Sequence, residues 1–180
     1  SSRGRAPLSR TPSRLPLHRP APLLTMCTHQ RRRHFVDARH VELVAEQFRR
    51  AAEEHTFGVI AYCLMADHVH LLVAGEHDDA DLKRFTKSAK QYSGFYFRQR
   101  TKLVLWQRWG FERVLRNDEA TPTVARYTIA NPVRAGLVRS PADYPFWGSF
   151  VQTREALLEY IQTDAPGGAL RSGAPAGGPP

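Results

Sequence analysis

The sequence has few cysteines and no long apolar run. Its two cysteines, Cys27 and Cys63, are too few for a disulfide framework. No apolar stretch approaches the roughly 20 residues that span a bilayer. The chain also opens without the cationic, apolar and small-residue pattern of a secretory signal. We therefore expect a globular protein of the reducing cytoplasm, with both cysteines buried as small hydrophobic side chains.

Proline is absent between Leu23 and Thr121, although both ends of the chain are rich in it. Because proline interrupts helices and central strands, regular structure is expected in this proline-free segment. The two ends contain mainly Pro, Gly, Ser, Ala and Arg, and they cannot bury enough apolar surface to fold. The composition predicts one folded domain over residues 23–160, with disordered tails at 1–22 and 161–180.

Acidic residues are missing from residues 1–22, which carry five arginines. The whole chain has 26 Lys and Arg against 17 Asp and Glu, a formal net charge of +9. Such an excess favours polyanionic partners such as nucleic acid, but more than half of it comes from the tail. The net charge alone is therefore weak support for a nucleic-acid partner.

Hydrophobic spacing predicts that strands and helices alternate along the folded segment. Mainly apolar runs predict strands, and apolar residues three or four positions apart predict helices. The expected strands cover 23–29, 56–65 and 67–74, with a short strand within 103–116, and the expected helices cover 38–55, 77–100 and 122–131. The first and last helices have Asp37 and Thr121 as expected N-caps. The helix over 77–100 is expected to bury a stripe formed by Leu82, Phe85, Ala89, Tyr92 and Tyr96.

Two histidines interrupt the apolar run LMADHVHLLV at residues 64–73. Side chains two positions apart in a strand share a face, so His68 and His70 are expected side by side. The pair is compatible with packed, hydrogen-bonded histidines. It is also compatible with a divalent metal site that leaves positions open for a third ligand and for substrate oxygens.

A tyrosine and an asparagine share one face of the expected helix 122–131. Tyr127 and Asn131 are four residues apart, so Asn131 could complete a site with the two histidines while the phenol lies beside it. A phenol is a poor nucleophile unless a cation or a base favours the phenolate, and a metal on a phosphate would favour it. The alternative is that Tyr127 is a packed core residue.

Basic residues lie along one face of the expected helix 77–100 and near its end. They form either a solvated helix face or a track for a phosphate backbone, with aromatic side chains stacking on unpaired bases. Further arginines follow in the second half of the chain. The candidate DNA-binding residues are Lys83, Lys87, Lys90, Arg98, Arg100, Arg113, Arg116 and Arg134.

The segments MADHVHLL, WQRWGFERVLRNDE, YTIANPVRAGLV and YPFWGS resemble, as a set, the IS200-like, REP-associated tyrosine transposases. Members share an HUH motif and a Tyr-x-x-x-Asn-Pro motif, and the resemblance spans about residues 25–150. It implies a ferredoxin-like α+β domain with a single antiparallel sheet. It also implies that His68, His70 and Asn131 hold Mg²⁺ or Mn²⁺ and that Tyr127 is the nucleophile.

The resemblance implies a substrate and a reaction as well. The expected substrate is single-stranded DNA beside a hairpin of a repeated extragenic palindrome (REP), cleaved to a 5′-phosphotyrosine link and a free 3′-OH. No GxxxxGK[ST] loop occurs, so no nucleotide cofactor is expected. Members commonly have Asn before the first histidine. Asp67 stands there in this chain, where it could orient the metal, bind it or cap the strand.

Two other activities and two oligomeric states stay open. The chain could be a domesticated, non-catalytic hairpin-binding protein, or a metal-dependent nuclease that uses water in place of tyrosine. A monomer is expected, because the Tyr127 segment follows closely enough to fold back on its own chain, and a dimer is the alternative.

Overall fold

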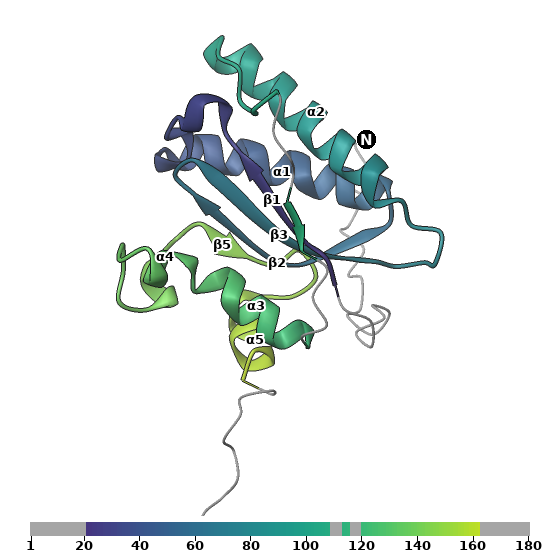
Figure 1. The fold of residues 1–180 in the computed structure, drawn as a ribbon, viewed down its shortest axis with the longest axis vertical. Helices are drawn as coiled ribbons and strands as arrows, with labels where there is room; N and C mark the ends of the chain where they lie inside the picture. Colours follow the sequence, from purple (N-terminus) through teal and green to yellow (C-terminus); the bar gives the residue numbers. More distant parts are fainter. Residues whose placement is uncertain (1–20, 109–112, 116–119, 163–180) are drawn as a thin grey trace, which may run out of the picture.

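One antiparallel sheet organises the computed structural model, which describes residues 21–108, 113–115 and 120–162. Its strand order is β4-β1-β3-β2-β5 (Figure 1). β1 and β3 lie side by side in the middle, and β4 pairs with β1 at one edge. The strands are β1 (Leu23–Cys27), β2 (Phe57–Met65), β3 (His68–Gly75), β4 (Arg113–Leu115) and β5 (Trp147–Gly148).

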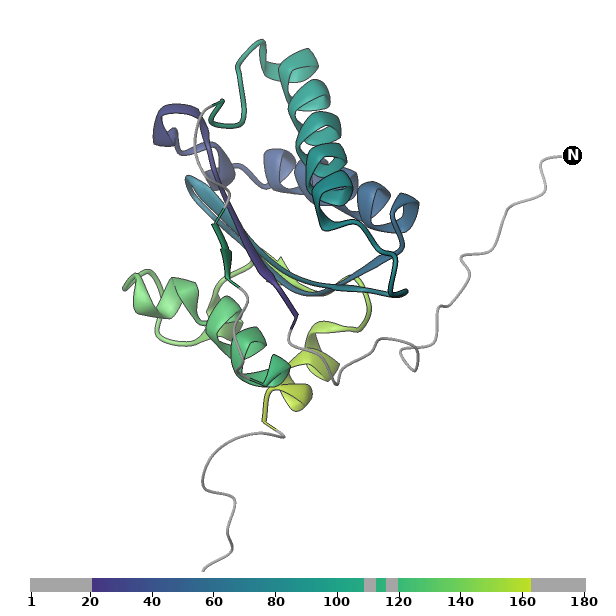
Figure 2. The ribbon, with the colours of Figure 1, turned by 45° about the vertical axis from the view of Figure 1, so that its right-hand side comes forward.

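Helices cover both faces of the sheet (Figure 2). The long helices α1 (Ala38–Glu54) and α2 (Leu82–Thr101) pack on one face. The other face carries α3 (Thr121–Ile129), α4 (Asn131–Arg134) and α5 (Arg154–Tyr160). Short 3-10 turns lie at His29–Arg31, His34–Val36 and Pro141–Asp143.

The first part of the chain follows the order β1-α1-β2-β3-α2-β4, and these four strands lie in the order β4-β1-β3-β2. This is the ferredoxin-like arrangement, so the predicted α+β fold is confirmed. The expected strands and helices of this part occur within a few residues of their predicted ranges. Asp37 caps α1 as predicted, because its carboxylate accepts a hydrogen bond from the Arg39 N–H.

Alternation along the strands divides the core between the two faces. Under α1 and α2, Phe48 stacks on Trp106 with ring centroids 6.0 Å apart, and Phe85 stacks on Phe57. On the other face, Trp147 is buried with residues of β2, β3, α3 and α5. Each face is thus filled by its own helices, and the sheet is buried between them.

The prediction for the second long helix was wrong at its start and in part of its buried stripe. α2 begins at Leu82, because the Asp81 carboxylate caps it by accepting hydrogen bonds from the backbone N–H groups of the next turn. Phe85 and Ala89 are buried as expected. Tyr96 is 38% exposed and Phe97 is buried in its place, because the stripe continues in steps of four residues from Phe85.

The last predicted helix differs in two ways. Thr121 is the first helical residue and is buried, so it is not the N-cap. The helix also ends at Ile129, and Asn131 begins the separate helix α4. Pro132 has no N–H to donate to the Thr128 carbonyl, and the Asn131 Nδ2 donates to that oxygen instead, at 2.9 Å.

The remaining predictions are tested unevenly. Cys63 is buried as expected, and Cys27 is only half-buried. Within the described residues, no helix is both long and apolar enough to cross a membrane. The predicted tails at 1–22 and 161–180 fall almost wholly outside the described residues.

Candidate active site

The two histidines project from β3 onto the face that α3 covers. Val69 and Leu71 alternate with them and point into the core under α1 and α2. Leu72, two positions after His70 and therefore on the same side of the strand, packs in the core under α3. The rings of His68 and His70 lie with centroids 4.9 Å apart at 87°. The predicted same-face pair is therefore present.

Each histidine is held through its Nδ1 atom. The Thr25 hydroxyl, across from His70 in β1, lies 2.9 Å from the His70 Nδ1. The Asp67 carboxylate lies 2.7 Å from the His68 Nδ1. These bonds leave the Nε2 atom of each ring as the nitrogen for a further ligand.

The environment of His70 keeps it neutral. Burial, together with the positive charges of His68 and Arg134, lowers the pKa of His70 from 6.5 to about 4. The imidazole therefore has a free lone pair at neutral pH. A metal ligand needs this state.

Tyr127 and Asn131 lie beside the histidine face, connected by Arg134. The Arg134 guanidinium stacks on the Tyr127 ring at 3.6 Å and donates to the Asn131 Oδ1 at 2.7 Å. Its charge also lowers the pKa of His70, so one side chain lies within electrostatic reach of all these groups. The Tyr127 side chain is 49% exposed, whereas its neighbours Thr128 and Ile129 are fully buried. Tyr127 therefore lies at the surface and is not a packed core residue.

The donor set suits a divalent cation held from one side. Two neutral imidazoles offer nitrogen ligands, and the Asn131 oxygen has a second lone pair beyond the one that Arg134 uses. Among the residues described, no group of three or more His, Cys, Asp or Glu side chains could hold a metal. His68, His70 and Asn131 are the residues that could hold such a cation.

The candidate DNA-binding residues lie in several parts of the fold. Lys83 and Lys87 are exposed near the start of α2, on the opposite face of the sheet from the histidines. Arg98 and Arg100 are exposed near the end of the same helix and on the same face. Lys90 is half-buried in the middle of the helix, Arg113 lies in β4, and Arg116 lies outside the described residues.

The end of α2 lies at the same end of the sheet as His68. Phe97 packs edge-on against the His34 ring at 4.8 Å. Phe35, which follows His34 in the chain, donates its N–H to the Ala66 carbonyl in the turn before His68. Arg98 and Arg100 therefore lie closer than Lys83 to the end of the sheet at which His68 stands.

Two residues of the site were not singled out from the sequence. Thr25 became visible only through the strand register, which places it opposite His70. Arg31 makes an ion pair with Asp67 at 3.0 Å. The run of three arginines at 31–33, a short distance after the first strand, was the one sequence signal for it.

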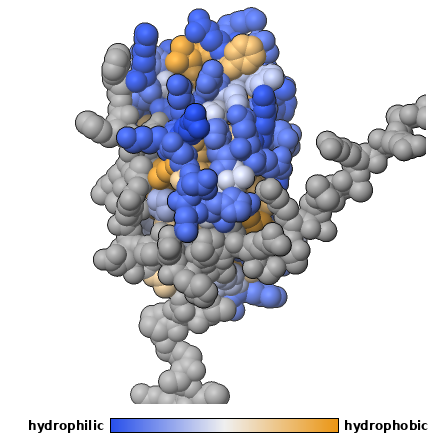
Figure 3. Space-filling model, turned by 90° about the vertical axis from the view of Figure 1, so that its right-hand side faces the viewer, coloured by the Kyte–Doolittle hydropathy of each residue, from blue (hydrophilic) through white to orange (hydrophobic). Residues whose placement is uncertain are grey.

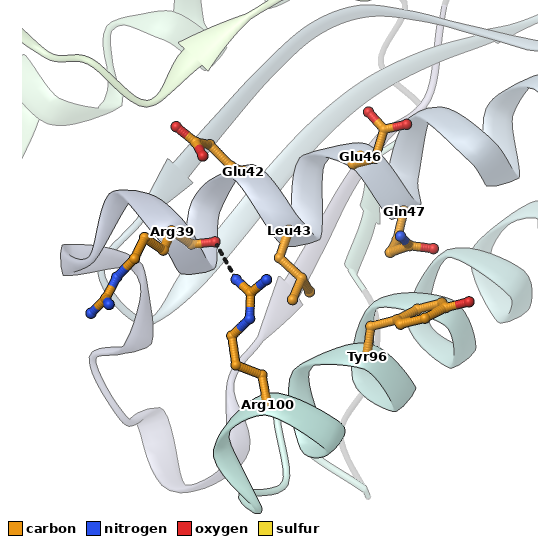
Figure 4. Close-up of a pocket in the computed structure, with 7 residues that line it drawn as sticks. All are labelled: Arg39, Glu42, Leu43, Glu46, Gln47, Tyr96 and Arg100. Atoms are coloured by element: carbon orange, nitrogen blue, oxygen red, sulfur yellow. Dashed lines mark hydrogen bonds between the residues drawn. The ribbon is translucent and has the colours of Figure 1, made fainter.

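A hollow lies elsewhere, between α1 and α2. It is about 270 Å³ in volume, and Leu43, Gln47, Tyr96 and Arg100 point toward it from the two helices (Figure 4). Arg100 also donates to the Arg39 carbonyl there. On the face in Figure 3, hydrophilic side chains predominate and hydrophobic ones form small separate patches among the residues that are coloured. Neither His68 nor His70 lines this hollow.

Comparison with known proteins identifies the family. The sequence model of the family described as "Transposase IS200 like" matches residues 22–116, more than half of the chain. The chain belongs to the IS200-like transposase family. The match includes both histidines of the IS200-like chain, and Tyr127 and Asn131 lie beyond it.

Two relatives of this IS200-like chain extend the comparison. A Haemophilus influenzae protein named as a REP-associated tyrosine transposase is 30% identical over 110 residues, covering 55% of this chain and 62% of that protein. The chain thus spans less than two thirds of that relative. A solved structure of a REP-associated tyrosine transposase bound to a REP hairpin aligns with a TM-score of 0.58 at 20% identity. The alignment covers 72% of this chain and 76% of that one, so the two share a fold.

Proposed function

We propose that this protein is a metal-dependent endonuclease and strand transferase of single-stranded DNA beside REP-like hairpins. The observation that carries the proposal is the meeting of two motifs on one sheet face. His68 and His70 project from β3 toward the side covered by α3, where the Tyr127 side chain is half exposed. Arg134 stacks on the Tyr127 ring, and its charge acts on His70. The named activities of the relatives are in line with this chemistry.

Tyr127 is the proposed nucleophile. Its Oη bonds to the scissile phosphorus and loses its proton to solvent, while the bond from phosphorus to the 3′-oxygen breaks. The leaving 3′-oxygen takes a proton and becomes a free 3′-OH, and the DNA stays on Tyr127 as a 5′-phosphotyrosine. The reverse attack by a 3′-OH rejoins the strand. Because the phosphoester is conserved, the reaction needs no nucleotide cofactor.

His68, His70 and Asn131 would hold the metal ion, proposed as Mg²⁺ or Mn²⁺. When bound, such an ion polarises a phosphate oxygen and offsets the charge that develops in transfer. The protein contributes a rigid support for these ligands. Both imidazoles stand on a central strand, and each has its Nδ1 fixed by a neighbouring side chain.

Cationic side chains would hold the DNA backbone. Arg98 and Arg100 near the end of α2 are proposed to contact the strand close to the site, and Lys83 and Lys87 a more distant part of the same molecule. The exposed rings of Phe95 and Tyr96, packed edge-on at 5.2 Å, offer surfaces on which unpaired bases can stack.

We also infer that the protein works as a monomer. α3 packs on β2 and β3 of its own chain, which supports a site formed within one subunit. Light scattering after size exclusion, with and without a hairpin, tests this. A dimer under both conditions would contradict it.

Histidine variants test the metal-dependent reaction. A labelled REP-like hairpin with a single-stranded flank is incubated with Mn²⁺ and either the wild type or the double variant His68→Ala, His70→Ala. The variant should lose cleavage and keep hairpin binding, because the proposed DNA-binding residues of α2 lie across the sheet from the histidines. Retained cleavage would remove the histidines from the mechanism. A wild type that binds and never cleaves would favour the non-catalytic alternative.

A further inference from the structure

Asp67, the residue before the first histidine, accepts hydrogen bonds through both carboxylate oxygens. The Asp67 carboxylate accepts from the His68 Nδ1 through Oδ1 at 2.7 Å and from the Arg31 Nε through Oδ2 at 3.0 Å. Both of its oxygens therefore have partners, and the three side chains form one chain of hydrogen bonds. Although burial raises the pKa of Asp67, the bonds from His68 and Arg31 outweigh it and hold that pKa below its ordinary value.

The arginine at the other end of this chain is itself fixed. The Arg31 Nη1 donates to the Cys27 Sγ at 3.0 Å, and Cys27 lies directly across from His68 in the sheet. The backbone of Gln30 and Arg31 is left-handed, with φ of 55° and 53°. Residues other than glycine rarely adopt this conformation, and it tends to persist where surrounding contacts and function require it.

The backbone around Asp67 is held to the same segment. The Thr28 N–H and the Thr28 hydroxyl both donate to the Asp67 carbonyl, at 2.9 and 3.0 Å. The hydroxyl also lies 2.8 Å from the Arg32 carbonyl. The segment that carries Arg31 and the turn that carries Asp67 are therefore fixed relative to each other before any ligand binds.

We propose that Asp67, clamped by Arg31, is a positioning residue that holds His68 as its Nδ1–H tautomer and so presents the Nε2 atom to a divalent cation. A carboxylate behind a histidine fixes the ring and makes it a stronger donor, which a hydroxyl behind His70 does less. Each Asp67 oxygen already accepts a hydrogen bond from a side chain, and we assign Asp67 the support of His68 rather than direct binding of the cation. The inference rests on the proposed function, since it supplies His68 to that metal site.

The first test needs no variant. Nitrogen-15 NMR of the metal-free wild type at pH 8 reports which ring nitrogen of each histidine carries the proton. His68 should carry it on Nδ1. A proton on Nε2 would overturn the inference, whatever the protein does with metal or DNA.

The second test is a titration with Mn²⁺ alone, followed by electron paramagnetic resonance. Asp67→Ala should weaken Mn²⁺ binding by about 10- to 100-fold. Asp67→Asn keeps an acceptor oxygen and Arg31→Gln keeps the carboxylate, so each should lose less. Asp79→Asn removes the same charge beyond the opposite end of β3 and is the matched control. It should bind Mn²⁺ like the wild type.

The outcomes separate this inference from the proposed function. His68→Ala should abolish Mn²⁺ binding, and if it binds normally the metal site itself is wrong. If His68→Ala abolishes binding while Asp67→Ala stays within twofold of the wild type, only the positioning role fails. A loss in Asp67→Ala as complete as that in His68→Ala would make Asp67 a direct ligand and would also overturn the inference.

Discussion

The pH dependence of stability should carry a signature of His70. Its pKa is about 4 in the folded protein against an ordinary 6.5, because burial, His68 and Arg134 all disfavour the protonated ring. Above pH 6.5 the ring is neutral in both states, so it adds no pH dependence. As the pH falls from 6.5 to 4, only the unfolded chain takes up the proton, so stability is lost across this window.

The size of the effect follows from the shift. At ~1.4 kcal/mol per pKa unit, the full shift corresponds to roughly 3 kcal/mol. Of this, about 2 kcal/mol should be lost between pH 7 and pH 4.5. Urea denaturation of the metal-free protein at the two pH values measures it, because the linear extrapolation gives the free energy of unfolding at each.

A variant isolates this residue from other titrating groups. His70→Gln cannot titrate, so it should lose about 2 kcal/mol less than the wild type between the two pH values. The same replacement at the exposed His77 is the control for the exchange of a histidine for glutamine. Equal losses in the wild type and in His70→Gln would refute the reasoning that burial keeps His70 neutral.

Three further predictions concern the core, a helix cap and the DNA surface. Phe48→Ala, which removes a fully buried ring stacked on Trp106, should cost about 3–5 kcal/mol in urea denaturation, and a loss below 1 kcal/mol would contradict the packing. Asp81→Ala should lower the stability by about 1 kcal/mol through the lost cap of α2, whereas Asp81→Asn should be nearly neutral. Lys83→Ala combined with Lys87→Ala should reduce the slope of log binding constant against log salt by about 0.7–0.9 for each lysine, and an unchanged slope would remove them from the DNA surface.

The central fold could be predicted from the sequence because its elements follow local patterns. The apolar run around the two histidines predicted β3, and Asp37 marked the start of α1. The same-face geometry of His68 and His70 follows directly from the two-residue period of a strand. These signals depend on neighbours in the chain, so no long-range information was needed.

The errors arose where a contact between distant or competing groups decided the structure. The break between α3 and α4 depends on Pro132, and on the Asn131 side chain that replaces the missing donor. Propensity rules place a helix stop near that proline and do not show that the amide takes over the hydrogen bond. As a result, Asn131 begins a separate helix from that of Tyr127.

The side chains around the histidines could not be predicted from the sequence, for the same reason. Thr25 lies 45 residues before His70, and Arg31 lies 36 residues before Asp67. Only the sheet register and the strained turn at Gln30 bring them into contact. Thr25 and Arg31 therefore acquire their role beside the histidines only when the chain is folded.

The covalent link between protein and DNA tests the central claim most directly. The wild type is incubated with Mn²⁺ and a hairpin oligonucleotide labelled on the 3′ side of the expected cut, and the products are separated under denaturing conditions. A labelled protein adduct should form, mass spectrometry should place the nucleotide on the peptide that contains Tyr127, and Tyr127→Phe should form none. An equal adduct from Tyr127→Phe, or cleavage by the wild type with no adduct at all, would contradict the account.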